Sequence, residues 1–412
     1  MNMHIKPILA ALRRHKAGTV LIALQIALTL AIVCNALFII HQRLAHLSEP
    51  TGVDEANLFV IENQWAGQTS NPQIDAQIRA DLVALRQLPG VRDASPSNAY
   101  PLEGSGWDDF ITLTPDQTEK TTDAAVYLGD EHLIDTLGLQ LVAGRNFRAD
   151  EVNSVGLHQY SVSPVVIVTR ALAERLYPDG SALGKPLYAM TSTPSTIIGV
   201  VDRLQRQGID AWSDSYAYQS MLWPQRLDMP RGIIYIVRAK PGQLAAAMRE
   251  APAALYTQNR MRIIDPKNGV LSFAQVRERA YDSDRGMAIL MGIISVVLLA
   301  ITAAGIVGLT SFWVGQRRRQ IGIRRALGAT RNDILNYFLT ENLLIGAMGV
   351  LIGAVLALVI NLWMIAHVEM SRLPLAYVLA GVVMLLLLGQ GAVLAPALRA
   401  SHVSPVEATR SV

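Results

Sequence analysis

The chain offers few groups that could carry out catalysis. Gly180, Gly184 and Lys185 are arranged superficially like a phosphate-binding loop. Such a loop needs four residues between its glycines and a Ser or Thr after the lysine to reach magnesium. Here three residues separate the glycines and Pro186 follows the lysine, so we interpret the segment as a turn. No other stretch provides a nucleotide-binding loop, and we expect that this chain does not hydrolyse ATP by itself.

The sequence also gives little indication of a metal site or of an acid–base catalytic site. The eight histidines are scattered and no H-E-x-x-H motif occurs. One cysteine, Cys34, cannot form an intrachain disulfide or a cysteine-based zinc or iron–sulfur site. Two acidic pairs, Asp108 with Asp109 and Asp282 with Asp284, are interpreted as solvated surface. Neighbouring strand positions point to opposite faces, so the first pair need not converge. We expect a non-catalytic chain that binds no cofactor or metal itself.

The composition indicates a membrane protein. Of the 412 residues, 51% are hydrophobic and 17% are charged, whereas a soluble domain carries about 25% charged residues. This deficit argues against disorder and against an ordinary soluble enzyme. The net charge of +3 is too small to suggest nucleic acid as a partner.

Four stretches lack Asp, Glu, Lys and Arg and are long enough to cross a bilayer. The first is too long for a cleaved signal peptide, and we interpret it as a retained anchor. Transporters that are coupled to protons or ions place charged groups near the membrane midplane, so the uncharged stretches argue against a secondary transporter or channel. We expect amides such as Asn35, Asn361 and Gln390 to join helices. The predicted transmembrane helices are residues 18–40, 286–314, 343–366 and 373–398.

Basic residues beside these stretches predict their orientation. The flank 1–17 carries four basic residues, the segment 315–333 six arginines against one acid, and the tail 399–412 two arginines. Basic loops stay in the cytoplasm. The insert 41–285 holds 23 basic and 29 acidic residues, a net charge of −6, and is predicted to lie outside. Both ends and the loop 315–342 are then cytoplasmic.

The insert is predicted to be a large α+β domain of two lobes. Strand-like and helix-like patterns alternate near both of its ends, over about 55–100 and 230–265. They predict two β-α-β units in a split, ferredoxin-like arrangement. A β-rich second lobe is expected between them, over about 100–225. Residues 272–314 are predicted to form one long helix that enters the second span.

The loop 315–342 is basic, punctuated by Ile and Leu, and compatible with a helix. It could be a lipid-surface helix attracted to anionic headgroups or a docking helix for a cytoplasmic partner. Ile321 and Ile323 cannot share a helix face, because they lie about 200° apart. Leu327 shares the face of Ile323. The predicted docking site therefore has Ile323 and Leu327 as anchors, and Arg319, Arg324 and Arg325 at its rim.

The predicted third span contains a pattern of small residues. Gly346, Gly349 and Gly353 form a ridge that permits close helix approach. Two explanations are open: ordinary packing within the chain, or a seam between two copies.

Several segments resemble a known family. Residues 317–353, RRRQIGIRRALGATRNDILNYFLTENLLIGAMGVLIG, resemble the signature of the FtsX-like permeases in their macrolide-exporter (MacB-like) branch. The segments LVAGRNF, VVIVTRALAERLYPDGSALGKPL and TIIGVV resemble the MacB-type periplasmic core domain, and APALRASHVSPVEATR resembles the family's tail. Gln320 departs from the Glu common in the family, which puts in doubt a charge pair with the ATPase.

The resemblance implies a dimeric ABC-type permease of the bacterial inner membrane, with a second copy or a paralogue as partner. ATP and magnesium would be bound by a separate cytoplasmic ATPase, whose closure is transmitted to the periplasmic domain. Efflux of a peptide, antibiotic or other amphiphile is the implied role, with a periplasmic adaptor and an outer-membrane channel as further partners. Two alternatives are open: a permease that extracts lipoproteins, and a regulator of a periplasmic cell-wall hydrolase.

Overall fold

A computed structural model describes residues 16–47, 49–66, 70–156, 162–189, 191–208, 215–229, 232–368 and 372–402. The chain divides into two compact units. The helical unit comprises Met1–Ser48 and Asp284–Val412, and the α+β unit comprises Glu49–Ser283. Most of the predicted flanks 1–17 and 399–412 lies outside the described residues.

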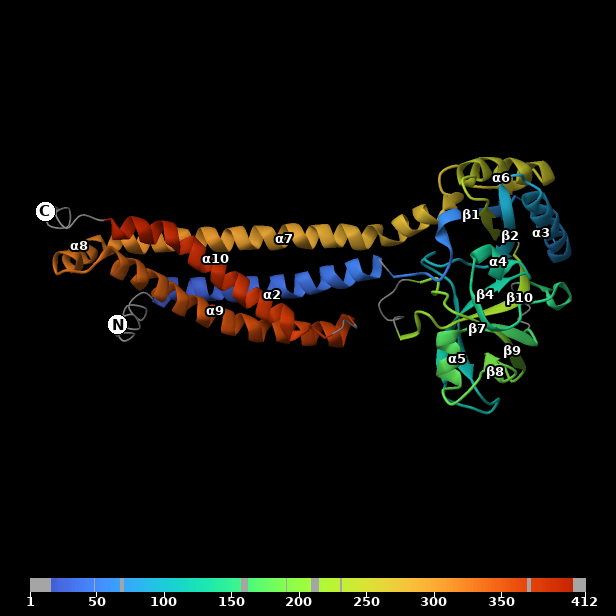
Figure 1. The fold of residues 1–412 in the computed structure, drawn as a ribbon, viewed down its shortest axis with the longest axis horizontal. Coiled ribbons are helices and arrows are strands. Elements are labelled where there is room, and N and C mark those ends of the chain that lie inside the picture. Colours follow the sequence, from blue (N-terminus) through green and yellow to red (C-terminus); the bar gives the residue numbers. More distant parts are fainter. Residues whose placement is uncertain are drawn as a thin grey trace. The chain divides into compact units, whose positions relative to one another are not determined.

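Among the described residues, four helices are long and apolar enough to cross a membrane (Figure 1). The first three contain their predicted spans and extend beyond them, because polar residues continue the helix at one or both ends. The fourth begins at Leu375, two residues after its predicted start, with Pro374 as its N-cap, and ends three residues beyond its predicted end. One of them is a single helix of 44 residues that crosses the division between the units, which confirms the predicted long helix. The four are α2 (Lys16–Leu47), α7 (Phe273–Gln316), α9 (Arg331–Val368) and α10 (Leu375–Ser401).

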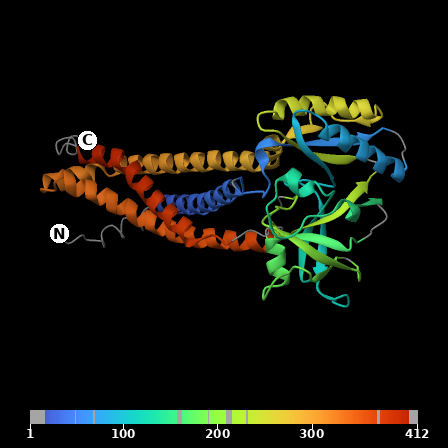
Figure 2. The ribbon, with the colours of Figure 1, turned by 45° about the vertical axis from the view of Figure 1, so that its right-hand side comes forward.

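Helix α2 packs against α9 and α10, and α9 packs against α10 (Figures 1 and 2). Polar side chains join these helices, as predicted. The Asn35 amide in α2 donates to the Ala357 carbonyl in α9 at 3.2 Å. The Asn361 side-chain oxygen accepts from the Leu373 N–H just before α10 at 2.9 Å. In the most apolar stretch of α2 61% of the residues are buried, against 17% for α7, so α7 is the most exposed of the four.

The first sheet of the α+β unit has the strand order β12-β1-β11-β2, with β13 also paired to β1 and every ladder antiparallel. Helix α3 (Asn71–Arg86) connects β1 to β2, and α6 (Leu244–Gln258) connects β11 to β12. Strand β11 of the second β-α-β motif thus lies between β1 and β2 of the first β-α-β motif, which confirms the split arrangement. The strands are β1 (Leu58–Trp65), β2 (Val91–Ser97), β11 (Ile233–Ala239), β12 (Arg262–Ile263) and β13 (Val270–Ser272).

Helix α3 begins at Asn71, directly after a capping residue. Ser70 and Gln73 form a capping box, and Pro72 lies in the first turn, where its missing N–H costs nothing. The buried face of α3, which carries Ile74 and Ile78, belongs to the same hydrophobic core as Phe59 of β1.

The second sheet has eight strands in the order β4-β3-β8-β9-β7-β10-β6, with β5 paired to β9. A further β4–β10 ladder closes six of these strands into a ring. Both sheets belong to one compact unit, so the division into two lobes stays a prediction. The elements are β3 (Trp107–Thr112), β4 (Thr122–Gly129), α4 (Leu133–Leu137), β5 (Leu141–Gly144), β6 (Asn153–Gly156), β7 (Val165–Thr169), α5 (Arg170–Leu176), β8 (Pro186–Ala189), β9 (Pro194–Val201) and β10 (Ser220–Asp228).

Candidate functional site

The predicted cytoplasmic loop is built from two helical pieces. Helix α8 (Arg318–Ala326) follows α7 after one residue, and α9 begins at Arg331, twelve residues before the predicted third span. Gly328 ends the first piece with φ +99°, a left-handed conformation that favours glycine. Thr330 then caps α9, because its hydroxyl accepts the Asp333 N–H at 3.2 Å while Asp333 accepts the Thr330 N–H at 2.9 Å. The corner between α8 and α9 is therefore well defined.

The apolar residues of α8 divide between two faces. Ile321 is only 5% exposed and joins Ile334 and Phe338 of α9 in the core of the helical unit. Ile323 is 48% exposed and Leu327, the residue that ends the helix, is 84% exposed. The structure thus buries one isoleucine against its own chain and leaves the two predicted anchors uncovered. Full burial of a leucine side chain contributes about 1.5–3 kcal/mol, and Leu327 lacks this contribution while it faces water.

The predicted rim residues are not equivalent. Arg319 and Gln320 are exposed, and Arg325 is half-buried. The Arg324 guanidinium lies 5.1 Å from the centre of the Tyr337 ring, so it contacts α9 as well as solvent. Gln320 and Arg324 also line a cavity of about 90 Å³ between α8 and α9.

An ion pair beneath α8 was not anticipated from the sequence. Arg317, between α7 and α8, donates through Nη1 to both Glu341 carboxylate oxygens at 2.9 Å. The same nitrogen donates to the Tyr337 hydroxyl at 3.3 Å. The one available signal was Glu341 itself, an acid two residues before an uncharged span.

The glycine ridge of α9 packs within the chain. A Cβ at Gly349 would lie 2.9 Å from the Ala23 carbonyl oxygen, and one at Gly353 would lie 2.8 Å from the Ala27 carbonyl oxygen. Both carbonyls belong to α2. Gly346 faces Leu386 of α10 instead. Intrachain packing therefore accounts for the contacts of all three glycines.

The segment around Gly180 is a turn that leads into β8, as predicted. Gly184 has φ +78°, and the Lys185 ammonium lies 4.3 Å from the centre of the Tyr177 ring.

The interpretation of the acidic pairs as solvated surface is wrong for Asp109, which is buried, and for Asp284, which is half-buried, whereas Asp108 and Asp282 are exposed as expected. Asp108 accepts from Arg206 Nη2 at 2.8 Å, and Asp109 is buried. Asp284 forms an ion pair with Arg43. These partners are distant in sequence, so strand alternation alone could not reveal them.

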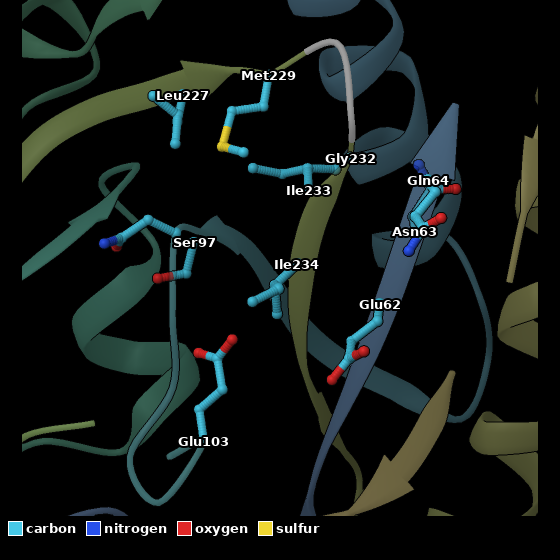
Figure 3. A pocket seen from close by; sticks show the side chains of 11 residues that line it. Glu62, Asn63, Gln64, Ser97, Glu103, Leu227, Met229, Gly232, Ile233 and Ile234 are labelled. Atoms are coloured by element: carbon cyan, nitrogen blue, oxygen red, sulfur yellow. The ribbon is translucent and has the colours of Figure 1, made fainter. Parts of the chain in front are cut away.

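Two cavities in the α+β unit share Glu62 and Glu103, and Figure 3 shows one of them. The Tyr100 hydroxyl donates to Glu62 at 2.9 Å, and the Tyr100 N–H donates to Glu103 at 3.2 Å. Burial, reinforced by the nearby Glu62 charge, raises the pKa of Glu103 from 4.5 to about 7. The cavity of about 240 Å³ has apolar walls from Leu227, Met229, Ile233 and Ile234. The cavity of about 400 Å³ is lined by the apolar Leu102, Leu271 and Val276 and by the charged Arg279.

These features define a class: a membrane protein with four candidate spans and an α+β domain inserted between the first and second. Two family models match the chain, the MacB-like periplasmic core domain over residues 19–254 and the FtsX-like permease C-terminal model over residues 292–405. The chain belongs to the MacB-like, FtsX-like family of ABC transporter permeases.

Named relatives have low sequence identity to the chain. The macrolide export ATP-binding/permease protein MacB of Chromobacterium violaceum is 26% identical over 77% of this chain and 49% of its own length. The uncharacterized ABC transporter permease YvrN of Bacillus subtilis is 25% identical over 69% of each chain. The chain thus spans about half the length of the first of these relatives. Among solved structures, the periplasmic region of MacB from Actinobacillus actinomycetemcomitans matches 57% of this chain and 97% of its own, with 15% identity and a TM-score of 0.35.

Proposed function

We propose that the chain is the permease subunit of a MacB-type ABC transporter in the bacterial inner membrane. Its termini and α8 would lie in the cytoplasm and its α+β unit in the periplasm. ATP and magnesium would be bound by a partner ATPase, and two permease subunits would form a dimer. The name of the Chromobacterium relative, which joins ATP-binding and permease functions, supports this division of labour because the chain aligns with 49% of that protein.

The observation that carries the proposal is the uncovered apolar pair on α8. Ile323 and Leu327 stand on one helix face, while Ile321 on the opposite side is buried in the chain's own core. Interfaces concentrate their energy in a few buried anchors that fill pockets on the partner. The exposed arginines Arg319 and Arg324 flank this pair and would act mainly on the rate and salt dependence of association.

The helix connectivity supplies the route for coupling. Helix α8 follows α7 after one residue, and the Ile321 N–H donates to the Arg317 carbonyl at 2.9 Å, so the helical turn continues across the junction. Helix α7 runs without a break into residues of the α+β unit. A displacement of α8 by a closing ATPase dimer would therefore be delivered along α7. We propose that this motion drives efflux of a peptide, antibiotic or other amphiphile, with an adaptor and an outer-membrane channel as candidate partners.

A pull-down of the copurifying ATPase in detergent tests the proposal. Leu327→Asp should reduce capture strongly, since a buried anchor contributes about 2 kcal/mol or more, equivalent to roughly 30-fold in Kd. Asn336→Asp is the matched control, because it adds the same charge at an exposed position of α9. Arg324→Ala should weaken capture mildly, and most at low salt. Equal capture by Leu327→Asp and the wild-type chain would refute docking through α8.

A further inference from the structure

The Arg317–Glu341 ion pair occupies the junction at which three helices meet. Arg317 lies between α7 and α8, and Glu341 lies in the third turn of α9. The Glu341 side chain is 3% exposed and that of Arg317 is 11% exposed. The pair is therefore shielded from water and from the competing ions that weaken surface salt bridges.

The surrounding contacts make this pair the polar anchor of the junction. Tyr337 lies one turn before Glu341, accepts a hydrogen bond from Arg317 and is covered on its ring by Arg324. Ile321 provides the apolar contact beside it. The first turn of α8 is thus held to α9 by one ion pair and one buried side chain, while its last turn is held by the corner at Gly328.

A buried pair of this kind is weak evidence for added stability, because desolvation of both charges offsets much of their attraction. Its strongest effect is geometric, because removal of one partner leaves an uncompensated buried charge that the structure must move to solvate. For Arg317, we expect this movement to be a rotation of α8 away from α9. The pair therefore favours one orientation of α8 over all others.

We propose that Arg317 and Glu341 are positioning residues that clamp the start of α8 to α9, so that a push on α8 moves α7 and α9 together. The inference rests on the proposed function in assigning the push to an ATPase. Without the clamp, α8 would still present Ile323 and Leu327 and would still bind, but its displacement would be absorbed by rotation about the Gly328 corner.

The orientation of α8 can be measured without the ATPase. In the full chain with Cys34→Ala, spin labels are attached at the exposed positions 319 and 336, and their distance distribution is recorded by pulsed electron paramagnetic resonance. We expect one narrow distribution in the parent and a broadened or displaced one after Glu341→Gln or Arg317→Gln. The swapped pair Arg317→Glu with Glu341→Arg should restore the narrow distribution. Arg331→Gln, at an exposed position of α9, is the matched control and should change nothing.

The functional arm compares capture of the copurifying ATPase with its stimulated turnover. Glu341→Gln should retain wild-type capture while the stimulated turnover falls by about fivefold or more, the lower end of typical coupling effects. The charge swap should recover the turnover, which a residue needed only for folding would not predict. Unchanged label distances in both single variants would overturn the clamp. Failure of the wild-type chain to capture any ATPase would instead contradict the proposed function and leave the distance measurement as the test of the clamp.

Discussion

Glu103 should make the stability of the α+β unit depend on pH near neutrality. Its carboxylate is half-buried beside Glu62, and its one described hydrogen-bond donor is the Tyr100 N–H. Arg279 lines the same cavity but donates to Asn268 at 2.9 Å. Burial raises the pKa of Glu103 from 4.5 to about 7, so the folded state holds this proton more tightly than the unfolded chain. The contribution of the protonated group is fully present below pH 4.5 and is lost as the pH rises through 7.

The size of this effect follows from the shift. Each pKa unit corresponds to 1.36 kcal/mol, so a change from 4.5 to about 7 sets a ceiling of roughly 3 kcal/mol. Glu103 is half-buried and its cavity opens to solvent, which screens the charge, so about 1–2 kcal/mol is the expected loss between pH 5 and pH 8. For a unit the size of Glu49–Ser283, that corresponds to roughly 2–8 °C in the unfolding temperature.

The assay is thermal unfolding of the full chain in detergent, followed by tryptophan fluorescence at pH values from 5 to 8.5. Trp223 is buried in β10 and reports on the α+β unit. Glu103→Gln should match the wild-type chain at pH 5 and exceed its unfolding temperature at pH 8. Glu278→Gln, an exposed position, is the control and should follow the wild-type profile. Identical pH profiles for Glu103→Gln and wild type would refute the reasoning.

Three further outcomes are expected. Gly353→Leu should force α2 away from α9 and destabilise the helical unit by about 1–3 kcal/mol, the usual cost of overpacking, which is detected as a lower unfolding temperature in detergent. Gly308→Leu, where the added side chain meets open space, should leave that temperature unchanged. Asp81→Asn should destabilise the α+β unit by about 3–5 kcal/mol in urea unfolding, because it removes one partner of an ion pair with Arg262 whose side chains are both fully buried; a loss below about 1 kcal/mol would contradict this. A reporter fused after Val412 should be active only in the cytoplasm, and activity in the periplasm would overturn the four-span orientation.

Local patterns were sufficient for the elements whose signal lies in neighbouring residues. The four uncharged stretches identified α2, α7, α9 and α10, because crossing a bilayer requires about 20 apolar residues. The helical period separated Ile321 from Ile323, and the structure buries the first and exposes the second. The alternation of strand and helix patterns at both ends of the insert also predicted the interleaved first sheet.

Other elements depend on partners far away in the sequence. Strands β5, β6 and β8 have four residues each, too few for a periodic signal. Strand β10 is buried along its whole length and contains Pro224, Arg226 and Asp228, so it shows no alternation and is interrupted by a residue that disfavours strands. Its charges are stabilised by tertiary contacts, such as the 2.8 Å bond from Arg226 to Asp75 in α3.

The same limit applies to the candidate site. The sequence identified the exposed anchors of α8 because their spacing is local. It could not pair Arg317 with Glu341, because that contact requires the chain to reverse direction at Gly328.

The interleaving of the first sheet also decides when the α+β unit can fold. Leu58 of β1 pairs with Arg238 of β11, 180 residues later, so the sheet has a high contact order and must close a long loop before any ladder forms. At translation rates of 5–20 residues per second, β1 waits roughly 10–35 s for its neighbour as an unpaired, aggregation-prone edge. A chain that is interrupted before residue 233 therefore lacks β11, β12 and β13, the strands that pair with β1, and leaves both edges of β1 unpaired.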